Sequence, residues 1–302
     1  MGKVVLECKG LHKKIGKKHI IKNVSTTLES GDILGFIGPN GAGKTTTIKL
    51  ILGLQKIDKG EVKLNGYDIT KNFEKAIERV GAIVENPDLY MYLSGYKNLQ
   101  LIAKMYKNIS KERIDEVVKL VGLQERIKDK VSKYSLGMRQ RLGIAQAILH
   151  KPNVLILDEP TNGLDPEGIR ELRKLLQKLA KEEKMAILIS SHNLAELDNF
   201  CTKICIIKNG EVIETEEIQK LKEEAKANYT KFKINDTVSI NQIIENAEIL
   251  NTTEFKVLTQ EEEVPRIVKK LVENNIKIYK IVEETVTLED AFLKKTGGNK
   301  IV

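Results

Sequence analysis

The feature that most constrains this chain is a glycine-rich loop that directly follows a short apolar run. Residues 33–37 are apolar, and the segment from Gly38 to Thr45 reads Gly-Pro-Asn-Gly-Ala-Gly-Lys-Thr. It matches the phosphate-binding pattern G-x-x-x-x-G-K-[ST] at every fixed position. Glycine permits the positive φ angles that let backbone N–H groups converge on an anion, and a helix starting here turns its positive end to that anion. A glycine turn without a ligand is the alternative, and the complete match argues against it.

The residue types in this loop predict a bound nucleotide with Mg²⁺. Lys44 is expected to reach the β- and γ-phosphates, and the Thr45 hydroxyl is expected to be a ligand of Mg²⁺. The predicted nucleotide-binding residues of the loop are Gly38, Pro39, Asn40, Gly41, Ala42, Gly43, Lys44, Thr45 and Thr46. The motif identifies a nucleotide and leaves open what its energy drives.

Composition limits the other classes of protein. The chain has 302 residues, of which 41% are hydrophobic and 30% charged, which is typical of a folded protein with one large domain and one small one. Its net charge is +8, and residues 1–220 carry +9. Such an excess could serve a nucleotide, an anionic membrane or nucleic acid, but an ordinary solvated lysine-rich surface is the favoured interpretation.

Neither a membrane span nor a secretory signal is expected. No run approaches the ~18–20 apolar residues that cross a bilayer, so we expect a cytosolic chain or one held to a membrane by a partner. The three cysteines are Cys8, Cys201 and Cys205. Because a four-residue spacing on a strand puts Cys201 and Cys205 on one face, buried thiols are favoured over a metal pair or a disulfide. This usage points to a reducing compartment.

Strands alternate with helices along most of the chain, which predicts an α/β domain with a parallel sheet and a ligand at the carboxyl edge of its strands. A small β-layer comes first, with strands at 3–8 and 19–28 joined by a basic turn at 13–18. The remaining segments of this domain are expected as strands at 61–64, 79–84, 154–157 and 185–190, and as helices at 97–105, 111–121, from 136 and at 169–179.

Three regions are expected on this basis. Residues 1–215 form the nucleotide-binding domain, and about residues 86–150 form a helical insert within it. Residues 216–302 form a small α+β appendix. Its expected elements are helices at 216–227, 264–274 and 288–296 and strands at 229–234, 254–258 and 276–282.

Acidic and imidazole side chains follow two of the predicted strands. Asp158 and Glu159 come directly after the apolar run 154–157, and His192 follows 185–190. Opposite a phosphate loop, Asp158 is suited to the Mg²⁺ shell and Glu159 to polarising an attacking water. His192 is expected to contact the γ-phosphate from the next strand end.

Residues 134–141, Tyr-Ser-Leu-Gly-Met-Arg-Gln-Arg, offer a hydroxyl and a glycine at a helix start. On physical grounds alone this is a helix cap. The stretch resembles the signature motif of ATP-binding-cassette (ABC) ATPases, in the variant Ser-Leu-Gly-Met. Gly38–Thr45 resembles the Walker A loop of that family, Leu155–Glu159 resembles Walker B, and Gly163-Leu164-Asp165 resembles the D-loop. His192 takes the place of the switch histidine.

The resemblance implies a P-loop ABC cassette: a parallel-sheet core, a small antiparallel β-layer and a helical insert, here with the α+β appendix. It also implies that two cassettes stack head to tail, so that Ser135 and Gly137 of one meet the ATP held by Lys44 of the other. A homodimer is expected. The resemblance further implies that hydrolysis separates the cassettes and moves a membrane partner that contacts the helical insert.

Two positions depart from the family pattern. Ile15 stands where an aromatic ring usually stacks on adenine, so aliphatic packing, helped by Ile20 or Val24, is expected to replace it. Glu85 stands where a glutamine is usual, and a carboxylate there can bind Mg²⁺ but cannot donate an amide hydrogen bond. This glutamate and the signature variant are similar to the ATPases of bacitracin- and lantibiotic-type peptide exporters. The end of the chain, from Val286, also resembles drug- and peptide-export ATPases.

The resemblance therefore predicts an ATPase subunit that uses ATP and Mg²⁺ to export a peptide antibiotic or another amphipathic drug- or lipid-like compound through a separate integral membrane permease. We expect it at the cytoplasmic face of the cell membrane, with no nucleic acid partner. Two alternatives stay open. A soluble cassette could act on ribosomes or DNA, although one cassette and a short insert argue against it. A drug-sensing module that signals rather than exports is not separable by sequence.

Overall fold

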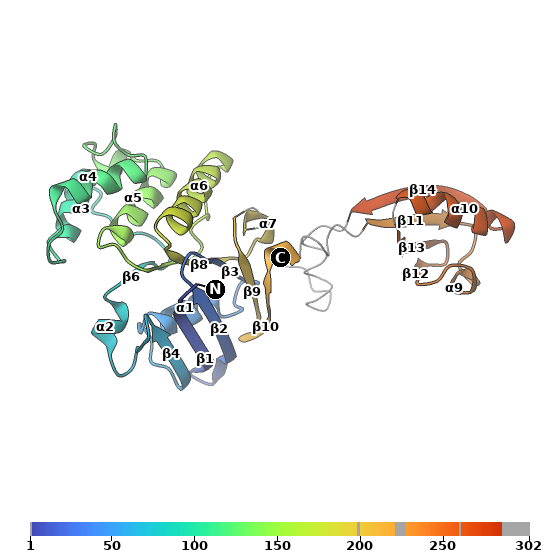
Figure 1. Cartoon of the computed structure of the whole chain (residues 1–302), viewed down its shortest axis with the longest axis horizontal. Coiled ribbons are helices and arrows are strands. Elements are labelled where there is room, and N and C mark those ends of the chain that lie inside the picture. Colours follow the sequence, from blue (N-terminus) through green and yellow to red (C-terminus); the bar gives the residue numbers. More distant parts are fainter. Residues whose placement is uncertain (1, 198–199, 221–227, 260, 286–302) are drawn as a thin grey trace. The chain divides into compact units, whose positions relative to one another are not determined.

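The computed structural model describes residues 2–197, 200–220, 228–259 and 261–285 (Figure 1). The chain divides into two compact units, one ending at Ile218 and the next beginning at Gln219. The first unit contains the glycine loop, the helical insert and a large mixed sheet. In the described residues that sheet has ten strands in the order β5-β4-β1-β2-β10-β9-β3-β8-β7-β6. No helix in the described part of the chain is long and apolar enough to cross a membrane.

One half of this sheet is antiparallel and precedes the nucleotide loop in sequence. Strand β1 pairs with both β2 and β4, and β4 turns into β5 at Asn65 and Gly66, which both have positive φ. The strands are β1 (Val4–Ile15), β2 (Lys18–Glu29), β4 (Lys59–Leu64) and β5 (Tyr67–Asp68). The predicted basic turn at 13–18 was too long, because the ladder continues to the pair Ile15 and Lys18 and leaves only Gly16 and Lys17 in the turn.

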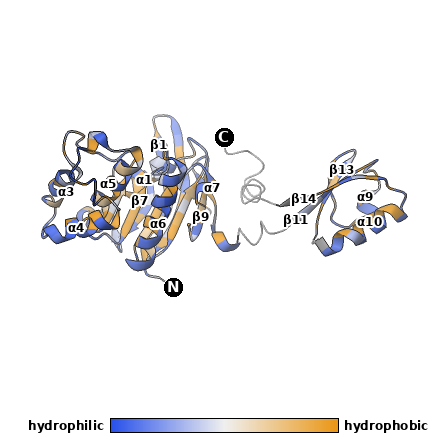
Figure 2. Cartoon of the chain, turned by 90° about the horizontal axis from the view of Figure 1, so that it is seen from above, coloured by the Kyte–Doolittle hydropathy of each residue, from blue (hydrophilic) through white to orange (hydrophobic). Residues whose placement is uncertain are grey.

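The other half of the sheet is parallel, apart from β10. Strand β3 lies between β8 and β9, and β7 lies between β8 and β6, all parallel. These strands are β3 (Ile33–Ile37), β6 (Val80–Ile83), β7 (Val154–Leu157), β8 (Ala186–Ser191), β9 (Lys203–Lys208) and β10 (Glu211–Glu217). Every residue of β3, β7 and β8 is buried, as continuous apolar runs predict. Figure 2 shows the central strands β7 and β9 in the hydrophobic colour.

Helices cover the large sheet or form the insert. The helices of the first unit are α1 (Lys44–Ile51), α2 (Phe73–Ile77), α3 (Gly95–Ala103), α4 (Lys111–Leu120), the 3₁₀ turn η1 (Val131–Lys133), α5 (Leu136–Ile148), α6 (Pro166–Glu182) and α7 (Leu194–Leu197). Helix α6 buries the leucines at 172, 175, 176 and 179, which recur at helical spacing. Ser94, Ser110 and Ser135 cap α3, α4 and α5 by accepting a hydrogen bond from the backbone three residues on.

The cysteine prediction was right about burial and wrong about its reason. Cys8, Cys201 and Cys205 are buried free thiols. Cys201 is not on a strand, because its N–H bonds to Leu197 O and β9 begins only at Lys203. The same-face argument therefore does not apply to Cys201 and Cys205.

The second unit is a small α+β fold. Its elements are β11 (Asn228–Ile234), α9 (Ile240–Ile243), β12 (Glu248–Asn251), β13 (Glu254–Leu258), η2 (Glu261–Glu263), α10 (Val264–Glu273) and β14 (Ile278–Thr285). In the described residues the antiparallel sheet runs β12-β13-β11-β14, which is the strand order of a split β-α-β arrangement. Its core includes Phe232 and Phe255, whose rings stack 5.0 Å apart, together with Leu271 of α10.

Two of the expected helices are not found as predicted. The prediction of a charged helix at 216–227 was wrong about where it begins, because residues 216–217 belong to β10 and pair with β9. Residues 221–227 and the expected helix at 288–296 lie outside the described residues.

The contact between β6 and α5 gives a test of the fold. A Cβ at Gly81 would lie 2.2 Å from Ala147 O and 3.3 Å from Pro152 Cγ. Gly81→Ala should therefore lower the free energy of unfolding of the first unit by about 1–3 kcal/mol, the usual cost of overpacking. Urea unfolding checks this, with Gly16→Asn as control, since Gly16 has φ +58 and no neighbour within 4 Å. Equal midpoints for wild type and Gly81→Ala would contradict the close packing.

Candidate functional site

The glycine loop joins β3 to α1 in a conformation that only small residues permit. Gly43 caps α1 with φ 107°, and Gly41 has φ 78°. A Cβ at Gly38 would lie 2.2 Å from Ile207 O, and one at Gly43 would lie 2.6 Å from Ile21 Cδ1. The glycines are thus required both by backbone geometry and by the approach of neighbouring strands.

Lys44 is nearly buried, with 6% of its side chain exposed. Its ammonium group contacts both the glycine loop and Glu159, which lies just after β7. Its Nζ donates to Gly38 O at 2.7 Å and to Pro39 O at 3.3 Å. It also forms an ion pair with Glu159 Oε1 at 3.2 Å. The structure therefore brings the loop lysine and the predicted base into direct contact.

Glu159 also contacts His192. The distance from Glu159 Oε2 to His192 Nδ1 is 2.8 Å, so one carboxylate joins Lys44 to His192. Glu159 has φ 48°, which is unfavourable for a residue with a Cβ and costs about 1–3 kcal/mol. This conformation directs its side chain toward both partners.

Ser190 fixes the acid pair from the neighbouring strand. Its Oγ donates to Asp158 Oδ1 at 2.6 Å and accepts the N–H of Glu159 at 2.8 Å. Asp158 is 2% exposed. Because β7 and β8 are parallel and adjacent, their carboxyl ends place Asp158, Glu159, Ser190 and His192 at one edge of the sheet.

A cavity of about 450 Å³ opens at this edge. The cavity is lined by residues of β1 and β2, of the glycine loop with the start of α1, and of the segments that follow β7 and β8. These residues are Ile15, Ile20, Asn40, Gly41, Gly43, Lys44, Thr45, Thr46, Glu159, Asn162 and His192. Ile15 and Ile20 thus lie beside the phosphate loop, as aliphatic packing of a base requires. Val24 belongs to the buried core and does not line the cavity.

The remaining predicted residues lie elsewhere. Gly38, Pro39 and Ala42 belong to the loop without lining the cavity, and Asp158 is buried and does not line it. Glu85 is 65% exposed and pairs with Lys49 of α1 at 2.9 Å. Ser135 and Gly137 lie at the start of α5, in the helical insert. The structure does not bring these last three into the cavity, and their roles stay predictions.

The oxygen donors fit a magnesium ion. The hydroxyl-bearing Thr45 lines the cavity, and Asp158, the residue directly after the buried strand β7, carries a carboxylate that accepts a hydrogen bond from Ser190. Mg²⁺ prefers oxygen ligands and keeps several of its waters, so two protein ligands are sufficient when phosphates supply others. In the described residues no group of three or more His, Cys, Asp or Glu side chains forms a separate metal site.

Sequence reasoning missed Ser190 and Asn162. Ser190 is a polar residue at the end of a buried strand, next to the strand that carries Asp158, and this position is a usable signal. Asn162 lies in the turn after Glu159. Asparagine is common in turns for reasons of backbone conformation, so its presence there did not indicate a place in the cavity.

Comparison with known proteins identifies the family. The family model described as ABC transporter matches residues 21–162. The chain is 50% identical over 307 residues to the uncharacterized ABC transporter ATP-binding protein YhcH of Bacillus subtilis (strain 168), covering 99% of this chain and 98% of that protein. The chain belongs to the ABC transporter ATP-binding proteins. It is an ABC ATPase, of the family that binds and hydrolyses ATP, and the predicted fold and enzyme class are confirmed.

Two further relatives refine the comparison. The bacitracin transport ATP-binding protein BcrA of Bacillus licheniformis is 39% identical, over 98% of this chain and 99% of that protein. The predicted similarity to bacitracin-type ATPases is therefore confirmed. The dimeric ATP-binding cassette MJ0796, in a post-hydrolysis state with ADP and Pi, is 27% identical with a TM-score of 0.63 and covers 70% of this chain and 98% of that one.

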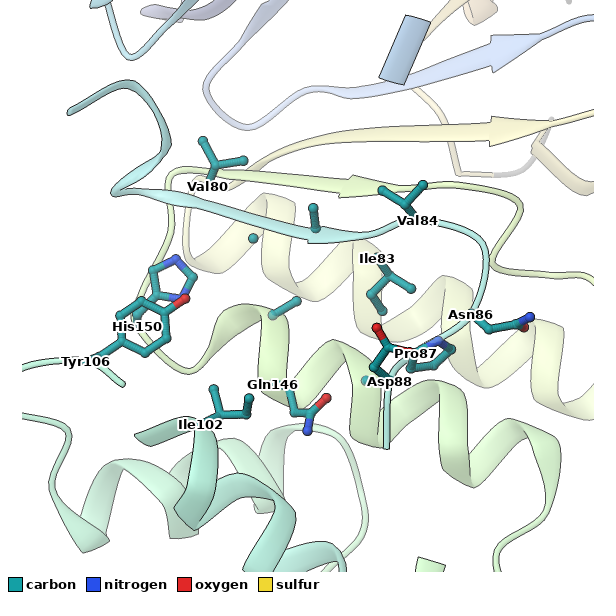
Figure 3. A pocket seen from close by; sticks show the side chains of 14 residues that line it. Val80, Ile83, Val84, Asn86, Pro87, Asp88, Ile102, Tyr106, Gln146 and His150 are labelled. Carbon is teal, nitrogen blue, oxygen red and sulfur yellow. The ribbon is translucent and has the colours of Figure 1, made fainter. Parts of the chain in front are cut away.

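A second hollow of this ABC ATPase, of about 340 Å³, lies between β6 and the helical insert (Figure 3). We call it the insert groove. The stacked rings of Tyr106 and His150, 4.4 Å apart, close one end, and Asn86, Pro87 and Asp88 lie at the other. The full lining comprises residues 80–84 and 86–88, with Ile102, Tyr106, Gly143, Gln146, Ala147 and His150.

The burial of His150 in the insert groove makes the stability of the fold depend on pH. Burial lowers its pKa, a backbone hydrogen bond at Val80 opposes this, and the charge of Arg113 lowers the pKa further. The folded pKa thus lies below the unfolded value of about 6.5. The unfolded chain therefore binds the proton more readily, and the stability contributed by neutral His150 is complete above about pH 6.5 and is lost as pH falls below it.

We expect His150→Gln to lose less stability than wild type between pH 7.5 and pH 5.5. Urea midpoints of both proteins at each pH measure the difference, since the other titrating groups are common to both. Identical pH dependence in the two proteins would contradict a neutral, buried His150.

Proposed function

We propose that this ABC ATPase powers the export of a peptide antibiotic or another amphipathic compound through a separate membrane permease. The observation that carries the proposal is the similarity to BcrA, a bacitracin transport protein, along almost the whole of both chains, including the C-terminal unit. Sequence similarity confined to the ATP-binding domain would support ATP hydrolysis but not a shared transport role. We expect the chain at the cytoplasmic face of the membrane, held there by the permease.

The site carries out hydrolysis through its own residues as follows. The glycine loop N–H groups and Lys44 bind the phosphates, and Thr45 and Asp158 would hold Mg²⁺, which would neutralise phosphate charge. When Lys44 turns to a phosphate, its ion pair with Glu159 is released. Glu159 is then free to orient a water, while His192 holds one carboxylate oxygen and contacts the γ-phosphate.

A second copy of the chain completes the site. Ser135 and Gly137 lie at the positive end of α5, and Gly137 has room beside it, with Leu164 Cδ2 at 3.9 Å from an added Cβ. In a head-to-tail homodimer this end would face the ATP of the partner. MJ0796, which is similar in fold, is described as a dimer.

The insert groove is the proposed contact for the permease. Exposed apolar side chains follow or precede its lining residues along the chain: Tyr92, four residues after Asp88, is 68% exposed, and Met105, next to Tyr106, is 78% exposed. Glu85 lies between this groove and α1, the helix that follows the glycine loop, because its neighbours Val84 and Asn86 line the groove and its own carboxylate pairs with Lys49 of α1. We propose that a change at the glycine loop reaches the groove through α1 and this ion pair.

Glu159→Gln should bind MgATP with near-normal affinity and hydrolyse it at least ~10²-fold more slowly, because a positioned base is lost. Steady-state phosphate release and equilibrium binding of labelled ATP measure the two effects. Turnover within a few-fold of wild type would refute the assignment of Glu159 as the base.

Gly137→Asp should stop the two cassettes from sharing ATP, since the new carboxylate fits within one chain but repels the phosphates of the partner copy. We expect ATP binding by the monomer within about twofold of wild type and at least a ~10-fold loss of hydrolysis and of ATP-dependent dimer. Gly137→Ala is the matched control and should dimerise. Loss of ATP binding by the monomer would instead place Gly137 in the chain's own site.

The permease contact is tested by isolating the ATP-trapped complex from its host. Tagged Glu159→Gln, solubilised gently with ATP, should co-purify with a multi-span membrane protein, and adding Tyr106→Glu should remove that protein. Tyr67→Glu is the control, because Tyr67 is similarly exposed, at 43% against 39% for Tyr106. Recovery of ribosomal proteins or DNA without a membrane protein would contradict the transporter assignment.

Export itself is tested by deleting the chain and measuring retention of labelled bacitracin. Wild type should restore efflux and Glu159→Gln should not. Drug-induced gene expression that depends on the chain, with efflux unchanged by its deletion, would show a sensor instead of an exporter.

A further inference from the structure

A carboxylate outside the cavity, Glu196 of α7, holds together the two segments that carry Glu159 and His192. Thr161, two residues after Glu159, donates its hydroxyl to Glu196 Oε2 at 2.5 Å. Ser191, the residue immediately before His192, has its Oγ 3.3 Å from the same oxygen. One oxygen of Glu196 thus joins the turn after β7 to the end of β8.

The partners of Glu196 leave little freedom at this junction. Thr161 is 3% exposed and Ser191 is fully buried. In the described part of the chain, hydroxyl groups rather than a basic side chain hold this carboxylate. Thr161 donates its hydroxyl to this carboxylate, and the single hydroxyl proton of Ser191 has two acceptors at 3.3 Å, Glu196 Oε2 and Asn193 O. Ser191 also accepts the N–H of Asn193 at 3.0 Å and so fixes the backbone on the far side of His192.

We propose that Glu196 is a positioning residue for ATP hydrolysis, which sets the 2.8 Å contact between Glu159 and His192 without touching the nucleotide. Ser190 supports Glu159 from β8, and Glu196 supports both segments from α7. Glu159 needs this support because its positive φ is unfavourable by itself. The inference rests on the proposed roles of Glu159 and His192.

The expected signature is a loss in turnover with nucleotide affinity retained. Glu196→Ala should lower kcat about ten- to a hundredfold, since small displacements of reacting groups have effects of this size, and leave KM for ATP within about twofold. Thr161→Val should behave in the same way, and Thr161→Ser, which keeps the hydroxyl, should recover most of the lost rate. Glu183→Ala, which removes an exposed carboxylate at the end of α6, is the matched control.

A double-mutant cycle separates positioning from general destabilisation. In a His192→Ala background, Glu196→Ala should cause little further loss of kcat, because the contact that it sets is already absent. All proteins are compared at a temperature at which their unfolding midpoints and ADP binding show that they are folded. The proposal is overturned if Glu196→Ala leaves kcat unchanged, if KM rises in parallel with the loss, or if the loss in the His192→Ala background is as large as in wild type.

The outcomes also separate this inference from the proposed function. If wild type hydrolyses ATP and Glu159→Gln does not, while Glu196→Ala matches wild type, only the positioning role fails. If wild type shows no MgATP hydrolysis, or Glu159→Gln is as active as wild type, the assignment of the site itself fails.

Discussion

The site depends on one carboxylate with two partners. Glu159 contacts Lys44 of α1 through one oxygen and His192 after β8 through the other, so three separate elements meet at a single side chain. Glu159 is 16% exposed and Lys44 is 6% exposed, and an ion pair so shielded from water is costly to leave with one partner missing. In the proposed site, a phosphate bound by Lys44 would replace Glu159 as the negative partner of the lysine, and His192 would remain beside the Glu159 carboxylate. The proposal therefore links the ion pair of Lys44 to the binding of nucleotide.

The parallel half of the sheet makes this meeting possible. Strands β3, β7 and β8 are buried along their whole length and end at the same edge, so the glycine loop, the acid pair and His192 emerge side by side. The antiparallel half contributes Ile15 and Ile20 to the lining of the cavity. Because the strands are buried, their backbone is held in place, and the side chains that follow their carboxyl ends can be positioned accurately.

Sequence predicted the features whose cause is local. The glycine loop, the apolar run of β7 and the serine-capped helices α4 and α5 carry their signals within a few residues, and the structure contains them close to the predicted bounds. Contacts between distant segments were not predictable. The pairing of Glu85 with Lys49, the hydroxyl of Ser190 between Asp158 and Glu159, and the place of Cys201 before β9 arise only when the chain is folded. The lengths of β1 and β2 were underestimated because their pairing partner, and not their own residue pattern, sets where they end.

The most direct test is a crystal structure of the chain with MgADP and vanadate. We expect Lys44 Nζ to contact a phosphate or vanadate oxygen and no longer Glu159, Thr45 and Asp158 to lie at the magnesium ion, and Glu159 to keep its contact with His192. A nucleotide bound away from the glycine loop, or Lys44 still paired with Glu159 while the loop is occupied, would contradict the proposed site.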